Sequence, residues 1–365
     1  MITLSRSGPS TVARLRNVSI LVRPRVWLVG LALLALVLVL AVVAIAVGTR
    51  WIPLDDVLAG LTGQANRATN LTVQRFRLPR AVVGVLVGMA LGLAGALVQA
   101  VTRNPIAAPD VLGVTAGASF GGVAVLLLFG GTTFGYGGAA AELSRIGLPA
   151  GAVLGAVVAA CIVLGASGTR GFGGRSFSTQ RVVLAGIVCH AAFMGLVNWG
   201  LSQGDVDQAS KASVWLVGSL HGRGWEHVVG VSAALVVLTP VALLLGRHLG
   251  ALALGEPSAA TLGISVSRTQ IGLFAVAFAL TGTAVAAAGP VNFVALLAPQ
   301  VAKRLVRAPG VPLVASALTG AALLLAADLL GRLAIPGVEL PAGAVTAVVG
   351  APCLLWLVVR KGGRR

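Results

Sequence analysis

The stretch "RNPIAAPDVLGVTAGASFGG", residues 103–122, places two prolines and one carboxylate directly before a long run of apolar and small residues. Asn104-Pro105 is typical of a turn, because proline lacks an N–H group and disfavours a helical conformation in the residue before it. Asp110 follows the second proline and suits the N-cap position of a new helix. The glycines after it include a small-xxx-small spacing, which lets helices approach closely. The stretch therefore predicts a tight reversal between two apolar helices.

The composition indicates that these helices lie in a lipid bilayer. Of the 365 residues, 57% are hydrophobic and only 10% are charged, and the mean hydropathy is +0.97. About a quarter of the residues of an ordinary soluble domain are charged. The first apolar run, Val26 to Gly48, holds no charge, and its length of about 23 residues spans a hydrocarbon core of roughly 30 Å. The run is too long for the apolar core of a signal peptide, so we expect a retained transmembrane helix.

Charged residues and Pro/Gly clusters divide the rest of the chain into further spans. An even number of spans leaves both termini on one side of the membrane. We expect ten helices, near residues 26–48, 81–101, 111–130, 147–167, 182–203, 228–246, 269–288, 291–306, 311–331 and 341–359.

The charge distribution sets the expected orientation. With the N-terminus in the cytoplasm, 18 of the 27 cationic residues and two acidic residues lie on the cytoplasmic side, against nine cationic and eight acidic residues outside. This distribution follows the positive-inside rule. The net charge of +17 is thus a signal of topology, and no nucleic-acid partner is needed to explain it. We divide the chain into a basic cytoplasmic N-terminus (1–25), a single transmembrane domain (26–360) and a cytoplasmic C-terminal tail (361–365).

Two blocks of four spans, near residues 80–204 and 268–359, hint at an internal duplication. In each block the second span begins beside prolines. One span separates the blocks, so the two halves cross the membrane in opposite directions and are expected to be inverted copies. Interrupted helices in such copies often line a substrate path.

The chain carries no signal for an energy source of its own. Its acidic residues lie in loops or at the ends of the expected helices, whereas ion-coupled transporters keep ionisable groups at membrane depth. His190 lies within a span, and we expect it to be an interhelical hydrogen-bond partner rather than a proton relay. No lysine completes a phosphate-binding G-x-x-x-x-G-K-[ST] loop. Any ATP-driven step therefore requires a partner protein.

The three cysteines give no evidence for a reactive site. Cys161, Cys189 and Cys353 lie in apolar runs and lack the spacing of metal ligands or of a redox pair. We expect them to be small buried side chains, and we expect no catalytic residue, metal site or cofactor.

The connection between the sixth and seventh spans contains "GEPSAATLG", residues 255–263. Pro257 suits the first position of a helix and Gly263 suits a C-terminal stop, which leaves a helix of about six residues. Such a short helix is unstable alone in water. It must pack either on its own protein or in a groove of another protein, and the residues alone leave both readings open.

Several stretches resemble one family in both order and spacing. They are "RLPR" at 77–80, "GLAGALVQAVTRNPIAAPDVLGVTAGAS" at 92–119, "STQRVVLAG" at 178–186, "GEPSAATLG", "GPVNFVALLAPQVAKR" at 289–304 and "ELPAGAVTAVVGAPCLLWLV" at 339–358. The resemblance is to FecCD-type permeases of ABC importers for iron–siderophore complexes and vitamin B12, over roughly residues 75–360. It implies an all-α polytopic membrane protein of about ten transmembrane helices with the type II ABC importer permease fold. The implied partners are a second permease subunit, identical or homologous, a cytoplasmic ABC ATPase dimer and an extracytoplasmic binding protein.

The resemblance also implies roles for two short segments on the cytoplasmic side. The first is the coupling helix that sits in a groove of the ATPase, with Gly255, Glu256, Pro257, Leu262 and Gly263 as its candidate residues. A carboxylate such as that of Glu256 is favoured at a helix N-terminus.

The second segment is an inner constriction of the translocation path, formed by Ser178, Thr179 and Gln180. Short polar side chains close a path without stranding a charge there. Ser and Thr are also preferred helix N-caps, and the two readings are compatible.

Arg77 and Arg80 lie on the expected outer side, against the charge bias, and at the start of a helix whose dipole disfavours cations. In the family the matching arginines receive carboxylates of the binding protein, and Arg332 matches a third such residue. The alternative for the pair is a cationic anchor that reaches the lipid headgroups. For Arg332 the alternative is a cation favoured by a helix C-terminus.

One residue departs from the family pattern. Gln300 stands where the family usually has histidine, and glutamine forms hydrogen bonds without being protonated near neutral pH. We expect the chain to import a ferric siderophore through the bacterial cytoplasmic membrane, in contact with membrane lipid and with both termini in the cytoplasm. Cobalamin or haem is the alternative cargo. An ion-coupled secondary transporter and a non-transporting membrane scaffold are the alternatives of another class.

Overall fold

The computed structural model describes residues 3–362 except 8–9, 16–17, 23, 49–50, 134–138, 172–173, 309 and 336. It is nearly all helical, and a helix coincides with each of the ten expected ranges. These helices are α1 (Pro24–Ala46), α4 (Leu78–Thr102), α5 (Val114–Thr133), α6 (Ala139–Ala166), α7 (Thr179–Gln203), α9 (Trp225–Gly246), α12 (Val266–Ala288), α13 (Val294–Val306), α14 (Leu313–Leu333) and α15 (Ala342–Gly362).

Seven helical segments among the described residues are long and apolar enough to cross a membrane. The shorter apolar stretches Val114–Leu128 and Ala342–Leu355 belong to α5 and α15. At 13 residues, α13 is about 20 Å long and cannot cross a core of roughly 30 Å as a helix alone. An irregular stretch, residues 289–293, precedes it. The expected all-α membrane fold is confirmed, and the eighth range is a partial helix.

The connections contain more structure than the sequence predicts. A three-stranded antiparallel sheet in the order β1 (Thr3–Ser7), β2 (Ser10–Leu15) and β3 (Val18–Val22) precedes α1. The hairpin β4 (Gly168–Gly171) and β5 (Gly174–Phe177) joins α6 to α7. These strands are an exception to the all-α expectation. The short helices are α2 (Leu54–Thr62), α3 (Arg67–Leu71), a π-helical segment Thr72–Arg77, α8 (Val206–Leu216), α10 (Leu249–Ala253) and α11 (Glu256–Thr261).

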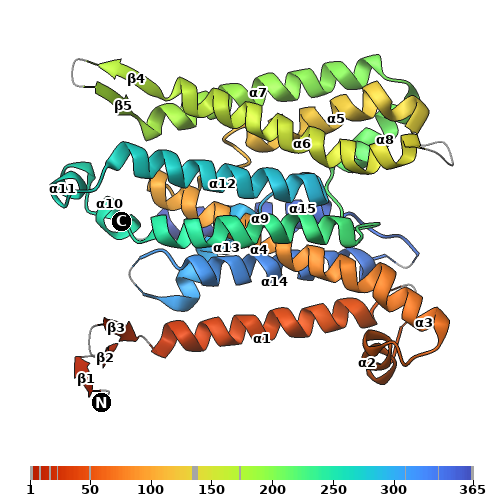
Figure 1. Ribbon diagram of the computed structural model, residues 1–365, viewed down its shortest axis with the longest axis horizontal. Coiled ribbons are helices and arrows are strands. Elements are labelled where there is room, and N and C mark those ends of the chain that lie inside the picture. Colours follow the sequence, from red (N-terminus) through yellow and green to blue (C-terminus); the bar gives the residue numbers. More distant parts are fainter. Residues whose placement is uncertain are drawn as a thin grey trace.

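The long helices run roughly side by side, with α1 along one edge of the bundle and α6 and α7 along the other (Figure 1). Helices α4, α12 and α14 are largely buried, whereas α1, α7 and α9 are largely exposed. Glycines of α4 make this centre compact, since a Cβ at Gly88 or Gly92 would clash with the backbone of α14. A Cβ at Gly95 would clash with the carbonyl of Ala295 on α13.

Helices α5 and α6 pack through glycines on both sides. Gly117 and Gly121 of α5 lie against the backbone at Gly151 and Gly155 of α6, and a Cβ at any of these positions would clash. The small-xxx-small spacing of the sequence is therefore a helix–helix contact, as predicted. Bare backbones can approach closely only where no side chain stands between them.

The reversal at residues 103–113 differs in detail from the prediction. Arg103 ends α4 in a left-handed conformation, with φ of 51°. Helix α5 begins at Val114, so Asp110 lies too far upstream to be its N-cap, which corrects the sequence-based assignment. The Asp110 carboxylate instead accepts hydrogen bonds from the Thr115 hydroxyl, at 3.2 Å, and from the backbone N–H of Phe293.

His190 of α7 meets the same reversal. Its Nδ1 lies 3.2 Å from the carbonyl oxygen of Asp110, so this histidine is a hydrogen-bond partner of the reversal between α4 and α5, where the sequence analysis expected a partner on another helix. Residues 103–113 thus contact the starts of α5 and α13 and the middle of α7, and the break in the helix joins distant parts of the bundle.

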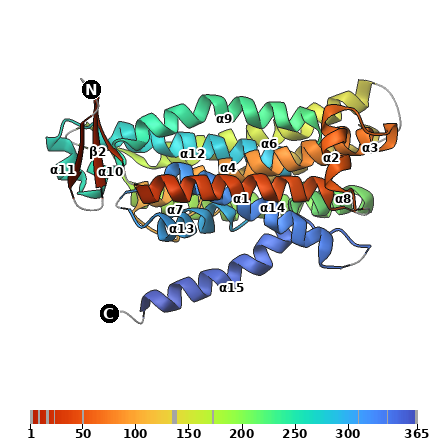
Figure 2. The same cartoon turned by 90° about the horizontal axis from the view of Figure 1, so that it is seen from below.

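The last helix is set apart from the others. Seen from below, α15 runs obliquely away from the bundle and its far end lies beyond the other helices (Figure 2). Val348, Val349 and Leu355 on it are largely exposed. Its near end packs on α14 and α13, so α15 is anchored at one end.

Candidate functional site

The C-terminal ends of α1 and α14 and the N-terminal end of α4 meet in a cluster of charged side chains. Arg77 is 8% exposed, and its Nη1 donates to the carbonyl oxygens of Ile45 and Ala46, at 2.8 Å each. These carbonyls belong to the last turn of α1, where no intrahelical donor is available. A cation at a helix C-terminus is also favoured by the helix dipole. Arg77 therefore caps α1.

Arg332, in the last turn of α14, caps the same end of α1. Its Nη1 donates to the carbonyl oxygens of Ala44, at 2.9 Å, and Val47, at 3.2 Å. Its Nη2 pairs with the carboxylate of Asp328, one turn earlier on α14. The cation thus satisfies carbonyls of a neighbouring helix, which the sequence did not indicate.

Asp328 joins two of the three expected docking arginines. The residue is 1% exposed, and its Oδ1 accepts from Nη2 of Arg80 at 2.8 Å and from Nε at 3.2 Å. Its Oδ2 pairs with Arg332. The sequence pattern indicates acids in loops or at helix ends, whereas the carboxylate of Asp328 is buried here. The available signal was an aspartate four residues before an arginine within one apolar helix.

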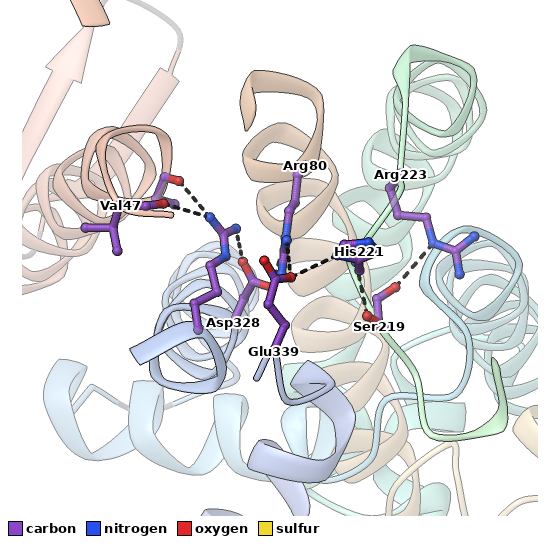
Figure 3. A network of polar contacts seen from close by, with 9 residues as sticks. Val47, Arg80, Ser219, His221, Arg223, Asp328 and Glu339 are labelled. Carbon is purple, nitrogen blue, oxygen red and sulfur yellow. Dashed lines mark hydrogen bonds and ion pairs between the residues drawn. The ribbon is translucent and has the colours of Figure 1, made fainter. Parts of the chain in front are cut away.

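Glu339, in the loop before α15, forms the more exposed side of the cluster. Its Oε2 lies 2.9 Å from Nη1 of Arg80 and 2.9 Å from Nδ1 of His221, whose side chain is 71% exposed (Figure 3). Burial alone would raise the pKa of Glu339, but the hydrogen bonds from Arg80 and His221 hold it below its usual value. The carboxylate therefore stays ionised at neutral pH.

The structure brings Arg77, Arg80 and Arg332 into one cluster, but not as an exposed cationic pair. Arg77 is directed to α1, whereas Arg80 is directed to Asp328 and Glu339. The two arginines on either side of Pro79 are therefore directed to different partners. Only Arg80 borders a solvent-exposed rim, through Glu339.

At the opposite end of the bundle, the expected short helix is present. Helix α11 covers six residues, Glu256–Thr261, with Pro257 in its first turn. Gly255 and Gly263 flank it with positive φ values of 115° and 80°, which glycine tolerates best. The expected boundaries are confirmed.

One side of α11 packs on its own chain and another is free. Ala259 is fully buried, and the Glu256 carboxylate accepts from the side-chain amide of Gln270 on α12, at 3.0 Å. Leu262, directly after α11, is 64% exposed. The chain therefore holds the short helix in place while leaving an apolar side chain available on its surface.

Ser178, Thr179 and Gln180 lie at the start of α7, directly after strand β5. Ser178 occupies the N-cap position of α7, as the sequence predicts. Its side chain, however, forms no capping hydrogen bond. The hydroxyl of Thr179 is buried and has no hydrogen-bond partner among the described residues. Gln180 is exposed. The three polar residues thus lie together at the N-terminal end of α7, a largely exposed helix.

Gln300 connects α13 to α4 and to the reversal. Its side-chain amide donates to Oε1 of Gln99 at 2.6 Å and to the carbonyl of Pro105 at 2.8 Å. Gln99 in turn donates to the carbonyl of Leu296 at 2.9 Å. A residue that forms two hydrogen bonds here needs no protonation, so glutamine suits the place where the resembled family usually has histidine.

Groups suited to metal binding are absent from the described part of the chain, where no three His, Cys, Asp or Glu side chains gather. The three cysteines are free thiols, of which Cys189 is buried, Cys353 is partly buried and Cys161 is exposed. The expectation of buried cysteines is therefore wrong for Cys161, which lies on an exposed face of α6.

Comparison with known proteins identifies the family. The model of the FecCD transport family matches residues 35–360. The chain is 39% identical over 333 residues to the ferric enterobactin transport system permease protein FepD of Escherichia coli, covering 90% of this chain and 94% of that protein. It is 37% identical over 333 residues to the Fe(3+)-citrate import system permease protein YfmE of Bacillus subtilis, covering 91% and 95%.

A B12 permease and a solved structure extend the comparison. The vitamin B12 import system permease protein BtuC of Klebsiella pneumoniae is 35% identical over 343 residues, covering 94% of this chain and 96% of that protein. A chain of a metal-chelate type ABC transporter, solved in an inward-facing conformation, superposes with a TM-score of 0.75 at 25% identity, covering 92% of this chain and 99% of the other. The chain therefore belongs to the FecCD transport family.

Proposed function

We propose that this chain is the membrane-spanning permease subunit of an ABC importer that carries a ferric siderophore into the cytoplasm. The observation that carries the proposal is the identity of 37–39%, over at least 90% of both chains, to permeases named for ferric enterobactin and ferric citrate. A fold made of membrane helices supports it. Cobalamin is the second candidate cargo, because the B12 permease is 35% identical over a similar length. Haem is a further alternative.

ATP hydrolysis is assigned to a separate ABC ATPase dimer, which would bind residues 255–263. The six-residue helix α11 is held by its own chain on one side and presents Leu262 on another, which suits a short helix that binds in a groove of a partner. A force on this helix is transmitted to α12 through the contact between Glu256 and Gln270. Ser178, Thr179 and Gln180, at the same end of the bundle, are proposed as the inner constriction of the path.

An extracytoplasmic binding protein is proposed to dock on the outer arginine cluster. Arg80 is the contact residue in this proposal, because it borders the exposed rim formed by Glu339 and His221. Arg77 and Arg332 are buried against α1 and would hold the cluster in position.

The second permease subunit and the membrane complete the proposed assembly. The oblique helix α15 leaves the bundle with apolar side chains exposed, and a homologous or identical permease is the partner proposed beside it. The protein is proposed to span the bacterial cytoplasmic membrane with both termini in the cytoplasm, as the charge distribution favours.

Uptake by the reconstituted importer tests the main proposal. Ferric siderophore should enter vesicles only when the ATPase and ATP are supplied, and uptake should persist when the proton gradient is collapsed. Uptake driven by a proton gradient without the ATPase would reject the ABC reading in favour of an ion-coupled transporter. Parallel assays with cobalamin and haem distinguish the cargo.

Two variants test the proposed partner surfaces. Gly263→Val should strain the stop after α11, because Gly263 has φ of 80°, and should lower co-purification of the ATPase. Unchanged ATPase association would remove residues 255–263 from the coupling site.

Arg80→Glu should weaken binding of the extracytoplasmic protein, most strongly at low salt. Arg75→Glu, an exposed cation on the same side, is the control, and equal losses for the two variants would reject the docking role.

A further inference from the structure

Helix α1 marks the two surfaces of the membrane. Its 23 residues extend about 35 Å, slightly more than a hydrocarbon core of roughly 30 Å. Leu31, Leu38 and Val42 along it are exposed apolar side chains, as expected where a helix faces lipid. Trp27, near its start, and Trp51, shortly after its end, are also exposed, and tryptophan is enriched at both membrane–water interfaces. Trp51 therefore lies at the level of one membrane surface.

Helix α2 begins three residues after Trp51, at this surface. It lies beside the far end of α1, on the outer edge of the bundle and crosswise to the long helices (Figure 1). Its nine residues, about 14 Å, are too few to cross the membrane. A short helix in this orientation lies along a membrane surface.

One side of α2 packs on its own chain. Val57 is 1% exposed and belongs to one hydrophobic cluster with Val73 and the last residues of α1. A Cβ at Gly60 would meet the side chain of Val73, so α2 and the π-helical segment Thr72–Arg77 are in close contact. The chain thus holds α2 in a fixed position against the end of α1.

Another side of α2 is apolar and exposed. Leu54, Leu58 and Leu61 follow one another at spacings of four and three residues, which places them on one face of a helix. All three are exposed, Leu58 by 63%. We call these three residues the leucine face. Trp51 connects it along the chain to the exposed apolar side of α1.

The remaining surface of α2 is acidic. Asp55 and Asp56 are exposed and lie off the leucine face. Carboxylates are costly in a hydrocarbon core, so they oppose deep insertion of the helix. A helix with one apolar face and one charged face suits the boundary between headgroups and acyl chains.

We propose that α2 is an interfacial anchor, whose leucine face contacts lipid at the boundary between headgroups and acyl chains while its two acids face water. The occupant is lipid because the leucine face lies at the level of Trp51 and adjoins the lipid-exposed side of α1. Such an anchor fixes the depth of the end of α1, which Arg77 and Arg332 cap. The inference requires only that α1 crosses the membrane, so it is independent of the cargo and of the ATPase.

Photolabelling of the full-length permease tests this proposal. The protein is placed in vesicles of phosphatidylethanolamine and phosphatidylglycerol that contain a diazirine lipid, with the diazirine either next to the glycerol (shallow probe) or at the end of an acyl chain (deep probe). Labelled residues are identified by mass spectrometry. The shallow probe should label residues 51–62 about fivefold more than the deep probe does, and residues 31–39 of α1 should show the reverse order. Labelling should be the same at low and moderate salt, because the contact is apolar.

Two double variants test the leucine face itself. Leu54→Gln combined with Leu58→Gln should lower shallow labelling of residues 51–62 about tenfold. The matched control combines Asp55→Asn with Asp56→Asn, on the same helix, and should be labelled at least as strongly as the natural chain. Labelling of the natural chain needs no substitution, so it tests the proposal even where the leucine variant fails to fold.

Three results would overturn the proposal. Labelling of residues 51–62 by a water-soluble diazirine instead of the lipid probes would place the leucine face in water, and its protection by added binding protein would assign it to that protein. Absence of labelling by either kind of probe in the assembled importer would assign it to another subunit. Deep labelling as strong as shallow labelling would place α2 in the hydrocarbon core. Labelling is measured without ATP or cargo, so failure here is distinguishable from failure of the import function.

Discussion

Replacing Asp328 by alanine should strongly destabilise the outer end of the bundle. The carboxylate is 1% exposed and is shared between Arg80 and Arg332, so its removal leaves the buried guanidinium of Arg332 without its ion-pair partner and leaves Arg80 with Glu339 alone. Breaking a buried ion pair in this way costs about 3–5 kcal/mol, because the remaining charge stays buried and uncompensated. The third arginine of the cluster, Arg77, adds a further positive charge nearby.

The expected loss is measured as the free energy of unfolding of the purified permease in mixed micelles. Asp328→Asn keeps the volume and an acceptor oxygen but removes the charge, and it should cost nearly as much as Asp328→Ala. Asp207→Ala, at an exposed acid on α8, is the matched control and should cost less than about 1 kcal/mol.

A double-mutant cycle completes this experiment. Combining Asp328→Ala with Arg80→Ala should cost less than the sum of the single losses, with a coupling energy of about 1–3 kcal/mol. Additive losses, or an Asp328→Ala loss equal to that of the Asp207→Ala control, would refute the reasoning that buried charge compensation stabilises this end of the bundle.

Three further predictions concern neighbouring features. Arg77→Met should lower the free energy of unfolding by about 2–4 kcal/mol, because two carbonyls of α1 lose charged donors. Protease cleavage near residue 48 should become faster as a result. The pKa of Glu339 is lowered on folding, so its contribution to stability is complete above the usual value of 4.5 and is lost as the pH falls through the folded pKa. The unfolding temperature of the natural chain should therefore decline at acid pH. The unfolding temperature of Glu339→Gln should lack this decline. Gly121→Leu should prevent close packing of α5 on α6 and lower the yield of folded protein, whereas Gly195→Leu, which has open space around it, should not.

The sequence alone predicted most of the helices because the signal for a membrane helix is local. About 20 apolar residues in a row suffice, and the bounds of α1, α4 and α12 fall within three residues of the expected ranges. The six residues of α11 were also predictable, since Pro257 and Gly263 mark its ends. The structure within the connections was not, because short strands and helices leave weak periodic signals.

The details of the outer cluster could not be read from the sequence for a different reason. Arg80 and Asp328 are 248 residues apart, and only the packing of α4 on α14 brings their side chains together. Arg77 and Arg80 were identifiable individually because the expected topology placed them against the charge bias. Their partners, and therefore the burial of Arg77, depended on contacts that no local pattern encodes.

The separation of Arg80 from Asp328 has a consequence for biosynthesis. A ribosome adding about 5–20 residues per second needs roughly 12–50 s to make the 248 residues between them. Throughout that interval α4 can be inserted, but Arg80 has no counterion from α14 and must remain with water and headgroups at the membrane surface. Arg332, which completes the cap on α1, is synthesised four residues later still. The first helix to emerge thus waits for nearly the whole chain, and the outer end of the bundle closes last.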